Sequence, residues 1–127
     1  MTAECVADLY DPDLAEAVSA VRVTHEEVGL AELTDWGWDE VFFFEPYDSA
    51  SQIEAVAGQP IITDIGLNDD ELLLFMKEGS PVRAVTGRWS FAFTPNRTPL
   101  RFTNVVRVVP IHYQSGDWDL LLLEPVT

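Results

Sequence analysis

The sequence predicts an α+β domain: a mainly antiparallel sheet of five or six strands, with two or three short helices mostly in the N-terminal half. Two observations lead to this class. Apolar residues at helical spacing and helix caps occur before residue 60, whereas β-rich runs separated by turn residues fill most of the later sequence. Hydrophobic residues make up 47% of the 127 residues, which is enough for one core. We therefore expect a single domain over residues 1–127.

The first helix is expected over residues 12–21, because Asp11 can cap it and the proline that follows suits the first helical position. Residues 22–34 leave two alternatives open. Thr24 and Glu27 fit a capping box and favour a second helix, whereas the β-branched residues favour a strand that enters a loop. A short helix or turn within residues 25–34 is the favoured interpretation.

The first strand is expected at Trp38–Phe44, where alternation places Trp38 on the same face as Phe42 and Phe44. Both faces are apolar in the second half of this run, which indicates a strand covered on both sides at that end. Pro46 ends the strand, because proline has no N–H to donate to a neighbouring strand.

A helix over residues 50–57 follows, with Ser49 among the possible caps and Gly58 at its end. The next feature is a hairpin, formed by ELLLFMK and PVRAVTGRW, with a glycine-containing turn around Glu78–Ser80. Its first strand alternates, so that Leu72, Leu74 and Met76 are expected on one face and Leu73 and Phe75 on the other.

The last third is expected to contain a loop and two more strands. Residues 94–101 hold two prolines and an asparagine and indicate a loop. Phe102–Tyr113 is a strand candidate that is interrupted near Pro110. Gln114–Gly116 forms a turn, and Asp117–Glu124 is the final, leucine-rich strand.

Charge is the strongest compositional feature, with 22 acidic and 7 basic residues and a net charge of −15. Residues 1–80 contain 19 acidic residues and only two basic ones, Arg22 and Lys77, which gives a net charge of −17. Residues 81–127 contain three acidic residues and five arginines, which gives a net charge of +2. The electrostatic field of this uneven negative charge repels nucleic acid and anionic membranes and attracts basic proteins. The alternative is that the charge serves only solubility.

Residues that could carry catalysis are few. His25 lies beside Glu26 and Glu27 and could act as a base oriented by a carboxylate, although such a neighbourhood is ordinary surface composition. His112 lies between strand residues and is expected to be a packed or edge histidine. No zinc-ligand cluster is present, and the acidic run at 68–71 lacks the alternating ligands of a calcium loop. We therefore expect a non-enzymatic protein with no metal and no cofactor.

No apolar run approaches the ~20 residues of a membrane helix, and the opening MTAECVADLY lacks the basic region and apolar core of a secretory signal. Cys5 is the only cysteine, which excludes an internal disulfide. From these features we expect no membrane association and a cytoplasmic location.

The candidate partner-binding patch is Asp35, Trp36, Asp39 and Glu40, which precede the three phenylalanines of the first strand. Aromatic residues with a polar handle are common interface anchors, and Trp36 is the tryptophan expected to be exposed. The competing interpretation, which has the higher prior, is that the tryptophans cover the edges of the core. The predicted function is an acidic protein-interaction module that binds and inhibits a basic protein partner such as a toxin, as immunity proteins do. The alternative is a bacterial housekeeping domain with a small-molecule pocket.

The run WDEVFFFEPYDSASQIEAVAG resembles a pattern in small, mostly uncharacterised bacterial proteins and lipoproteins. In that pattern a Trp-Asp pair opens a strand ending in Phe-x-Pro-Tyr, and a short helix then closes at glycine. LLLFMKEGSPVRAV is also similar, so that the likeness covers about half the chain. The matching residues of the first run are Trp38, Asp39, Val41, Phe44, Pro46, Tyr47 and Gly58.

This resemblance implies an α+β fold and no particular activity. The sequence departs from the lipoprotein members because it lacks a signal and a properly placed lipid-site cysteine, which puts an envelope location in doubt. In topology alone, the arrangement is also similar to outer-membrane assembly lipoproteins and to β-lactamase inhibitor modules.

Overall fold

A computed structural model describes residues 12–45, 48–58, 71–87, 89, 91 and 100–124 of the chain. Its strands form two sheets, one with the order β1-β6-β7 and one with the order β4-β3-β2-β5, and all pairs are antiparallel. The α+β class is therefore confirmed, but the strand number is wrong, because seven strands are present in the described part of the chain. The elements are α1 (Pro12–Thr24), β1 (Val28–Gly29), the 3-10 helix η1 (Leu30–Leu33), β2 (Glu40–Phe44), α2 (Ala50–Ala57), β3 (Glu71–Lys77), β4 (Ser80–Gly87), β5 (Leu100–Thr103), β6 (Arg107–His112) and β7 (Trp118–Leu123).

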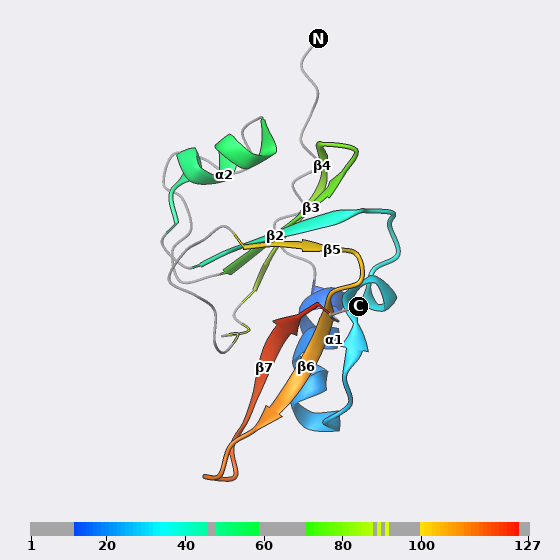
Figure 1. Cartoon of the computed structure of the whole chain (residues 1–127), viewed down its shortest axis with the longest axis vertical. Helices are drawn as coiled ribbons and strands as arrows, with labels where there is room; N and C mark the ends of the chain where they lie inside the picture. The colour runs from blue at the N-terminus through cyan, green and yellow to red at the C-terminus, as the bar shows by residue number, and fades with distance from the viewer. Residues whose placement is uncertain are drawn as a thin grey trace.

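One large hydrophobic cluster lies between the two sheets and α1, and a smaller one lies between the four-stranded sheet and α2. Consequently α1 and α2 cover opposite faces of the four-stranded sheet, and α1 also covers the inner face of the β6–β7 hairpin (Figure 1). Both sheets contribute side chains to the large cluster. No helix among the described residues is long and apolar enough to span a bilayer.

The first helix forms as expected but continues to Thr24, three residues beyond the predicted end. It buries Leu14, Val18 and Val21 on one side. His25 ends the helix in the left-handed region, with φ of 61°, and its N–H donates to the carbonyl of Val21 at 2.9 Å. This bond satisfies one of the carbonyls that a helix end leaves without a partner.

Both alternatives for residues 22–34 occur in part, as the short strand β1 followed by the 3-10 helix η1. The expected box of Thr24 with Glu27 does not form. Instead Glu32 accepts the N–H of Gly29 at 2.8 Å, and Glu27 pairs with Arg107 at 2.5 Å. The segment is therefore fixed by its contacts with β6, which its local sequence does not reveal.

β2 is covered on both faces at its end, as predicted, because Phe43 belongs to the large cluster and Phe44 to the smaller one. Trp38 differs from the prediction and packs in the large cluster rather than beside Phe42 and Phe44. The reason is that β2 starts only at Glu40, so that the alternation of the strand does not extend back to Trp38.

The predicted helix over 50–57 matches α2, and Ser49 is its cap. The Ser49 hydroxyl accepts from the N–H of Gln52 at 3.2 Å, while the Gln52 side chain accepts from the N–H of Ser49 at 2.7 Å. Gly58 ends the helix with φ of 77°, a conformation that favours glycine. The predicted stop at Pro46 lies outside the described residues.

The hairpin of β3 and β4 is confirmed, including the alternation of β3 between the two clusters. Glu78 and Gly79 form its turn with φ of 51° and 80°, the positive values of a tight two-residue turn. The register shifts between Phe75 and Met76, which leaves Val82 as the extra residue of a bulge. Val82 packs against the large cluster, on the same side as Arg83, which lies over Trp36.

The predicted strand Phe102–Tyr113 is in fact two strands in different sheets, β5 and β6. The break lies at the turn around Asn104, where Val106 donates its N–H to the carbonyl of Thr103 at 3.1 Å, and not at Pro110. Pro110 is tolerated inside β6 because β1 pairs only with Arg107 and Val108, so that β6 has no β1 partner at the proline. The expected loop is also shorter at its end, because Leu100 already belongs to β5; residues 94–99 lie outside the described part.

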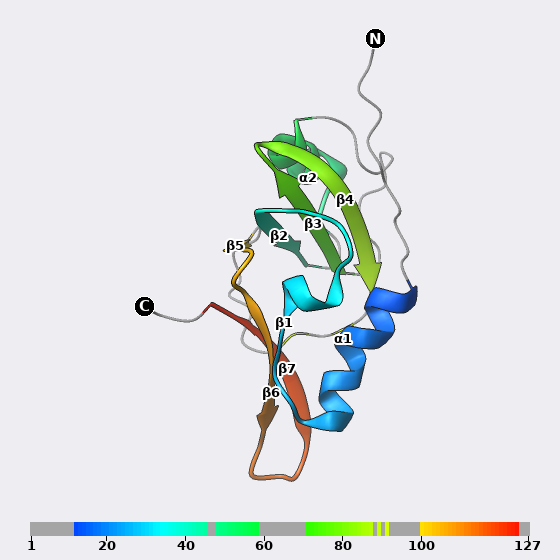
Figure 2. The same cartoon turned by 90° about the vertical axis from the view of Figure 1, so that its right-hand side faces the viewer.

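The final hairpin agrees with the sequence. β6 and β7 pair from Arg107 with Leu123 to His112 with Trp118, and a turn at Gln114–Gly116 joins them. Figure 2 shows this hairpin extending below the four-stranded sheet, with α1 along one of its sides.

Glu71 is the only buried charged residue among those described, with 5% of its surface exposed. Its carboxylate accepts the backbone N–H of Trp89 at 2.8 Å and that of Phe91 at 3.3 Å. Trp89 and Phe91 are buried in the large cluster just after β4 ends. Glu71 begins β3, as the predicted strand ELLLFMK implies, but its burial and its bonds to this aromatic segment were not predicted.

Candidate functional site

The four predicted contact residues lie in the loop before β2 and at the start of that strand, beside the β3–β4 turn. The N–H of Asp39 donates to the carbonyl of Met76 at 2.9 Å, and the Asp39 carboxylate accepts the N–H of Glu78 at 2.9 Å. Asp35 and Asp39 are both exposed. The loop therefore presents two carboxylates to solvent, one of which also stabilises the turn.

Trp36 is not the exposed residue that the sequence predicts. Its ring packs edge-to-face on Phe75 at 5.1 Å, and the guanidinium of Arg83 lies 4.3 Å above the ring centre. Its indole Nε1 is buried and has no hydrogen-bond partner within the part of the chain that is described. Trp36 is thus half-buried, and Arg83 covers part of its remaining surface.

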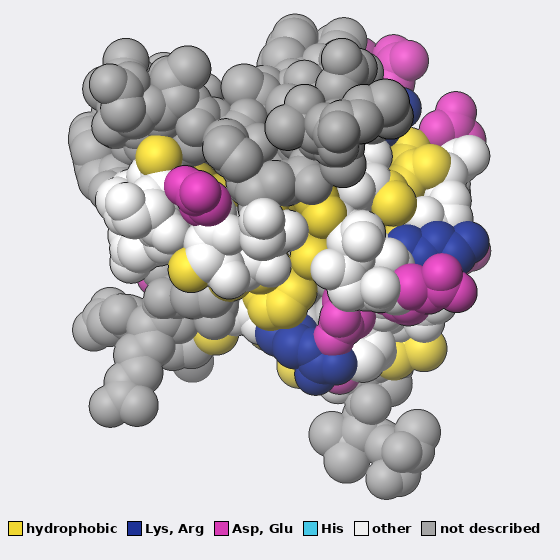
Figure 3. Space-filling view, turned by 90° about the horizontal axis from the view of Figure 1, so that it is seen from above, with side chains coloured by type: hydrophobic (Ala, Val, Ile, Leu, Met, Phe, Trp, Pro, Cys, Tyr) yellow, Lys and Arg dark blue, Asp and Glu magenta, His cyan; other side chains and the backbone are white. Residues whose placement is uncertain are grey.

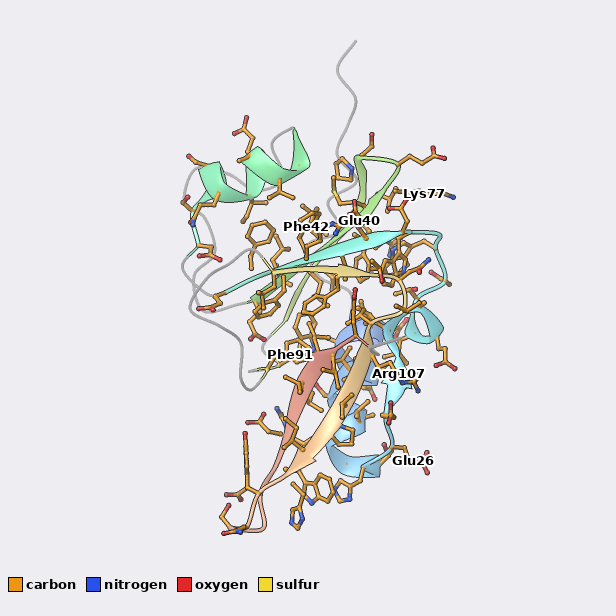
Figure 4. All side chains as sticks on the ribbon, in the orientation of Figure 1. Glu26, Glu40, Phe42, Lys77, Phe91 and Arg107 are labelled. Atoms are coloured by element: carbon orange, nitrogen blue, oxygen red, sulfur yellow. The ribbon has the colours of Figure 1, made fainter. Side chains whose placement is uncertain are left out.

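Glu40 forms an ion pair with Arg101 of the neighbouring strand β5. A methyl group placed on Gly37 would lie 3.3 Å from the Lys77 amino nitrogen, so that Lys77 reaches over the loop. Figure 4 shows Lys77 and Glu40 near the same end of β2. The structure thus places Asp39 beside the β3–β4 turn and Glu40 beside Arg101. Two further cations lie at the same loop, Lys77 near Gly37 and Arg83 over Trp36.

Both histidines stack on Trp118, an arrangement that their separation in sequence does not suggest. The His25 ring lies 3.6 Å from the Trp118 ring with planes 10° apart, and the His112 ring lies 4.5 Å away with planes 16° apart. No hydrogen bond between His25 and a carboxylate occurs within the described ranges, and Glu27 instead pairs with Arg107. The described residues also include no group of three metal ligands. A role of His25 as a base therefore gains no support from its contacts.

A polar network joins α1 to the edge of β7. Arg22 donates to the carbonyl of Trp89 at 2.8 Å and pairs with Asp119 at 3.2 Å. The Tyr113 hydroxyl donates to Asp119 at 3.4 Å. Partial burial raises the pKa of Tyr113 above 10.0, and the negative charge of Asp119 and this hydrogen bond raise it further.

The β6–β7 hairpin carries an apolar surface that sequence reasoning missed. Val108, Leu120 and Leu122 point into the large cluster, so that the alternate residues point to the other face. These alternate residues are also aliphatic at four positions, here called the outer apolar face: Val109, Ile111, Leu121 and Leu123. The available signal was the sequence itself, since LLLL is apolar at consecutive positions and therefore on both faces of a strand.

The described arginines are all in contact with other side chains. Arg22, Arg101 and Arg107 pair with Asp119, Glu40 and Glu27, and Arg83 stacks on Trp36. On the face shown in Figure 3, the Lys and Arg side chains likewise lie beside Asp and Glu side chains. Many carboxylates are exposed and form no ion pair with any described residue: Asp13, Glu16, Glu26, Glu32, Asp35, Asp39, Glu54, Glu78 and Asp117.

Comparison of the chain with protein-family models, curated proteins and solved structures found no match. The resemblance to small bacterial proteins and lipoproteins stays a prediction, as do the patch at Asp35–Glu40 and the absence of enzymatic activity.

Proposed function

We propose that this chain is a non-enzymatic interaction module that binds a basic protein, as inhibitors and immunity proteins do. One observation carries the proposal: the described arginines are in contact with other side chains of the chain, whereas many exposed carboxylates form no ion pair with any described residue. The surplus negative charge therefore faces solvent and is available to a partner. The proposed location is the cytoplasm.

Charge of this kind acts mainly on association. Complementary fields raise the rate at which two proteins meet by about 10- to 1000-fold at low salt, and they reject partners of the same sign. Nucleic acid is disfavoured for the same reason, because its binding requires lysine and arginine to neutralise phosphates. With a net charge of −15, a basic protein is the partner that this surface favours.

Within this surface, the loop at Asp35–Glu40 is the proposed contact patch. Asp35 and Asp39 are exposed there, and the Arg101–Glu40 and Arg83–Trp36 contacts connect the loop to neighbouring strands. A loop that is ordered before binding loses less conformational entropy on association. The patch thus combines exposed charge with a preformed backbone.

The test begins with capture of partners from lysate at low ionic strength, followed by purification of the retained protein. Its association rate with the chain is then measured by stopped-flow at low salt and at about 0.15 M salt, where charges are screened over ~8 Å. We expect the rate to fall with salt and to fall further in Asp35→Lys. Glu54→Lys on α2 is the matched control, since it changes the net charge equally at another exposed site.

Two results would count against the proposal. The first is that the retained protein is neutral or acidic. The second is that its association rate with the chain does not depend on salt. If Asp35→Lys and Glu54→Lys slow association equally, the field is supported and the assignment of the patch to Asp35–Glu40 is wrong.

A further inference from the structure

The outer apolar face of the β6–β7 hairpin is the least expected surface of the molecule. Val109 and Leu121 are direct cross-strand partners, Leu123 lies opposite Arg107, and Ile111 lies opposite Asp119. The four aliphatic side chains therefore form one continuous patch between a charged residue at each end. Leu123 is 49% exposed, and the other three are half-buried.

No described element packs on this face. The inner residues of the same strands belong to the large cluster, and none of the four outer residues packs against either cluster. Figures 1 and 2 agree that α1 lies along one side of the hairpin only. Contiguous apolar surface on a small domain commonly marks a contact site.

The edge of β7 is less suited to a partner than this face. The Asp119 carboxylate accepts the N–H of Leu120 at 3.0 Å, and Arg22 binds both Asp119 and the carbonyl of Trp89. A strand added to this edge would have to break the Leu120–Asp119 bond to reach that backbone N–H group. The side chains of the face, in contrast, are free of such bonds.

Charge selects the occupant of this face. A second copy of the chain would bring another −15 charge toward the first, and self-association is disfavoured accordingly. The carboxylates around the hairpin include Asp117 at its tip, which is exposed, and Glu26 after α1, whose side chain points away from the ribbon in Figure 4. A cationic partner gains from both the apolar patch and the net negative charge of the chain.

We propose that the outer apolar face receives the apolar side chains of a basic protein partner, with the acidic surface contributing attraction and the aliphatic patch contributing affinity. This inference rests on the proposed function and adds a second, apolar contact to it. Interfaces commonly combine a desolvated apolar centre with a polar rim, and the centre supplies most of the affinity.

Two synthetic peptides test the proposal, one of alternating lysine and leucine and one of alternating lysine and serine. They carry the same charge, so that any difference in binding reports the apolar side chains. Titrations are followed by isothermal calorimetry at low salt, and amide shifts in NMR spectra locate the site. We expect the leucine peptide to bind more tightly than the serine peptide and to shift the amides of Val109, Leu121 and Leu123.

The variant Leu121→Ser/Leu123→Ser should weaken the leucine peptide about 10- to 100-fold and leave the serine peptide unchanged. Leu123→Ser alone should weaken the leucine peptide by a smaller factor; it is the variant least able to disturb the fold, because Leu123 is half exposed. Val23→Ser is the matched control, since Val23 is an aliphatic residue on α1 that is 79% exposed. Urea midpoints of the variants show whether each one is folded.

The possible outcomes separate the two proposals. If both peptides bind equally, or if Val23→Ser and Leu123→Ser have the same effect, the apolar face is not the contact and this inference fails while the charge proposal stands. If neither peptide binds at low salt, the proposed function fails. If light scattering shows a dimer that Leu123→Ser dissociates, the face binds a second copy and the choice of a basic partner is wrong.

Discussion

Replacing Glu71 with leucine tests whether a single buried carboxylate holds the segment after β4. The side chain accepts the N–H groups of Trp89 and Phe91 at 2.8 and 3.3 Å, and both aromatic rings are buried in the large cluster. Leucine has a similar size but cannot accept a hydrogen bond. In Glu71→Leu these two N–H groups would therefore be buried without this acceptor.

The expected loss follows from those two groups. A buried polar group without a partner costs about 1–3 kcal/mol, so that the free energy of unfolding should fall by about 2–6 kcal/mol. The unfolding entropy is about 2.1 cal/mol/K per residue, or about 0.27 kcal/mol/K for this chain, which converts the loss to a Tm lower by about 7–22 °C. Glu71→Gln retains one carbonyl acceptor and should lose about half as much.

Urea and thermal unfolding, followed by circular dichroism, measure both quantities. Glu54→Leu on the exposed side of α2 is the control and should change the stability by no more than about 0.5 kcal/mol. If Glu71→Leu is as stable as the wild type within that limit, the two N–H groups do not depend on the carboxylate, and the assigned role of Glu71 is wrong.

Three further substitutions are informative. Gly87→Ala would place a methyl group 2.4 Å from the Trp89 ring, and we expect a loss of about 1–3 kcal/mol in urea unfolding; unchanged stability would show that the ring can move at no cost. His25→Ala should be less stable than His25→Gly by about 1 kcal/mol, because both lose the ring stack but only glycine suits φ of 61°; equal stabilities would contradict the strain. Asp119→Asn should lower the pKa of Tyr113, seen as an earlier ionisation of one of the three tyrosines in an ultraviolet titration. Because folding raises this pKa, stability in the wild type should fall as pH rises above 10.0, and the fall should be smaller in the variant.

Local patterns predicted the elements that local interactions determine. α2 has its cap and its terminal glycine within the ten residues Ser49–Gly58, and the β3–β4 hairpin has its own turn, so that both were predicted with their boundaries nearly correct. The run from Phe102 to Tyr113 failed for the opposite reason. Its division between two sheets depends on pairing with β2 and with β7, which no short window of the sequence reveals.

In the candidate site, too, features set by local sequence were predicted and features set by distant contacts were not. Asp35 and Asp39 are exposed as expected of acidic loop residues, whereas the position of Trp36 depends on Phe75 and Arg83, which lie on other strands. The outer apolar face could have been inferred from the consecutive leucines of β7. The stack of both histidines on Trp118 could not have been inferred, because His25 and Trp118 are more than ninety positions apart in the sequence.

The packing of α1 against β7 has a consequence for when the chain can fold. Arg22 of the first helix bonds to Asp119, 97 residues later, and the large cluster combines Leu14 and Val18 with Leu120 and Leu122. During synthesis these partners of α1 leave the ribosome last, so that the apolar side of the helix waits until β7 has emerged. Contacts between distant parts of a chain also slow the search for the native state. We therefore expect the native core to form only after synthesis of β7, as one late and cooperative event.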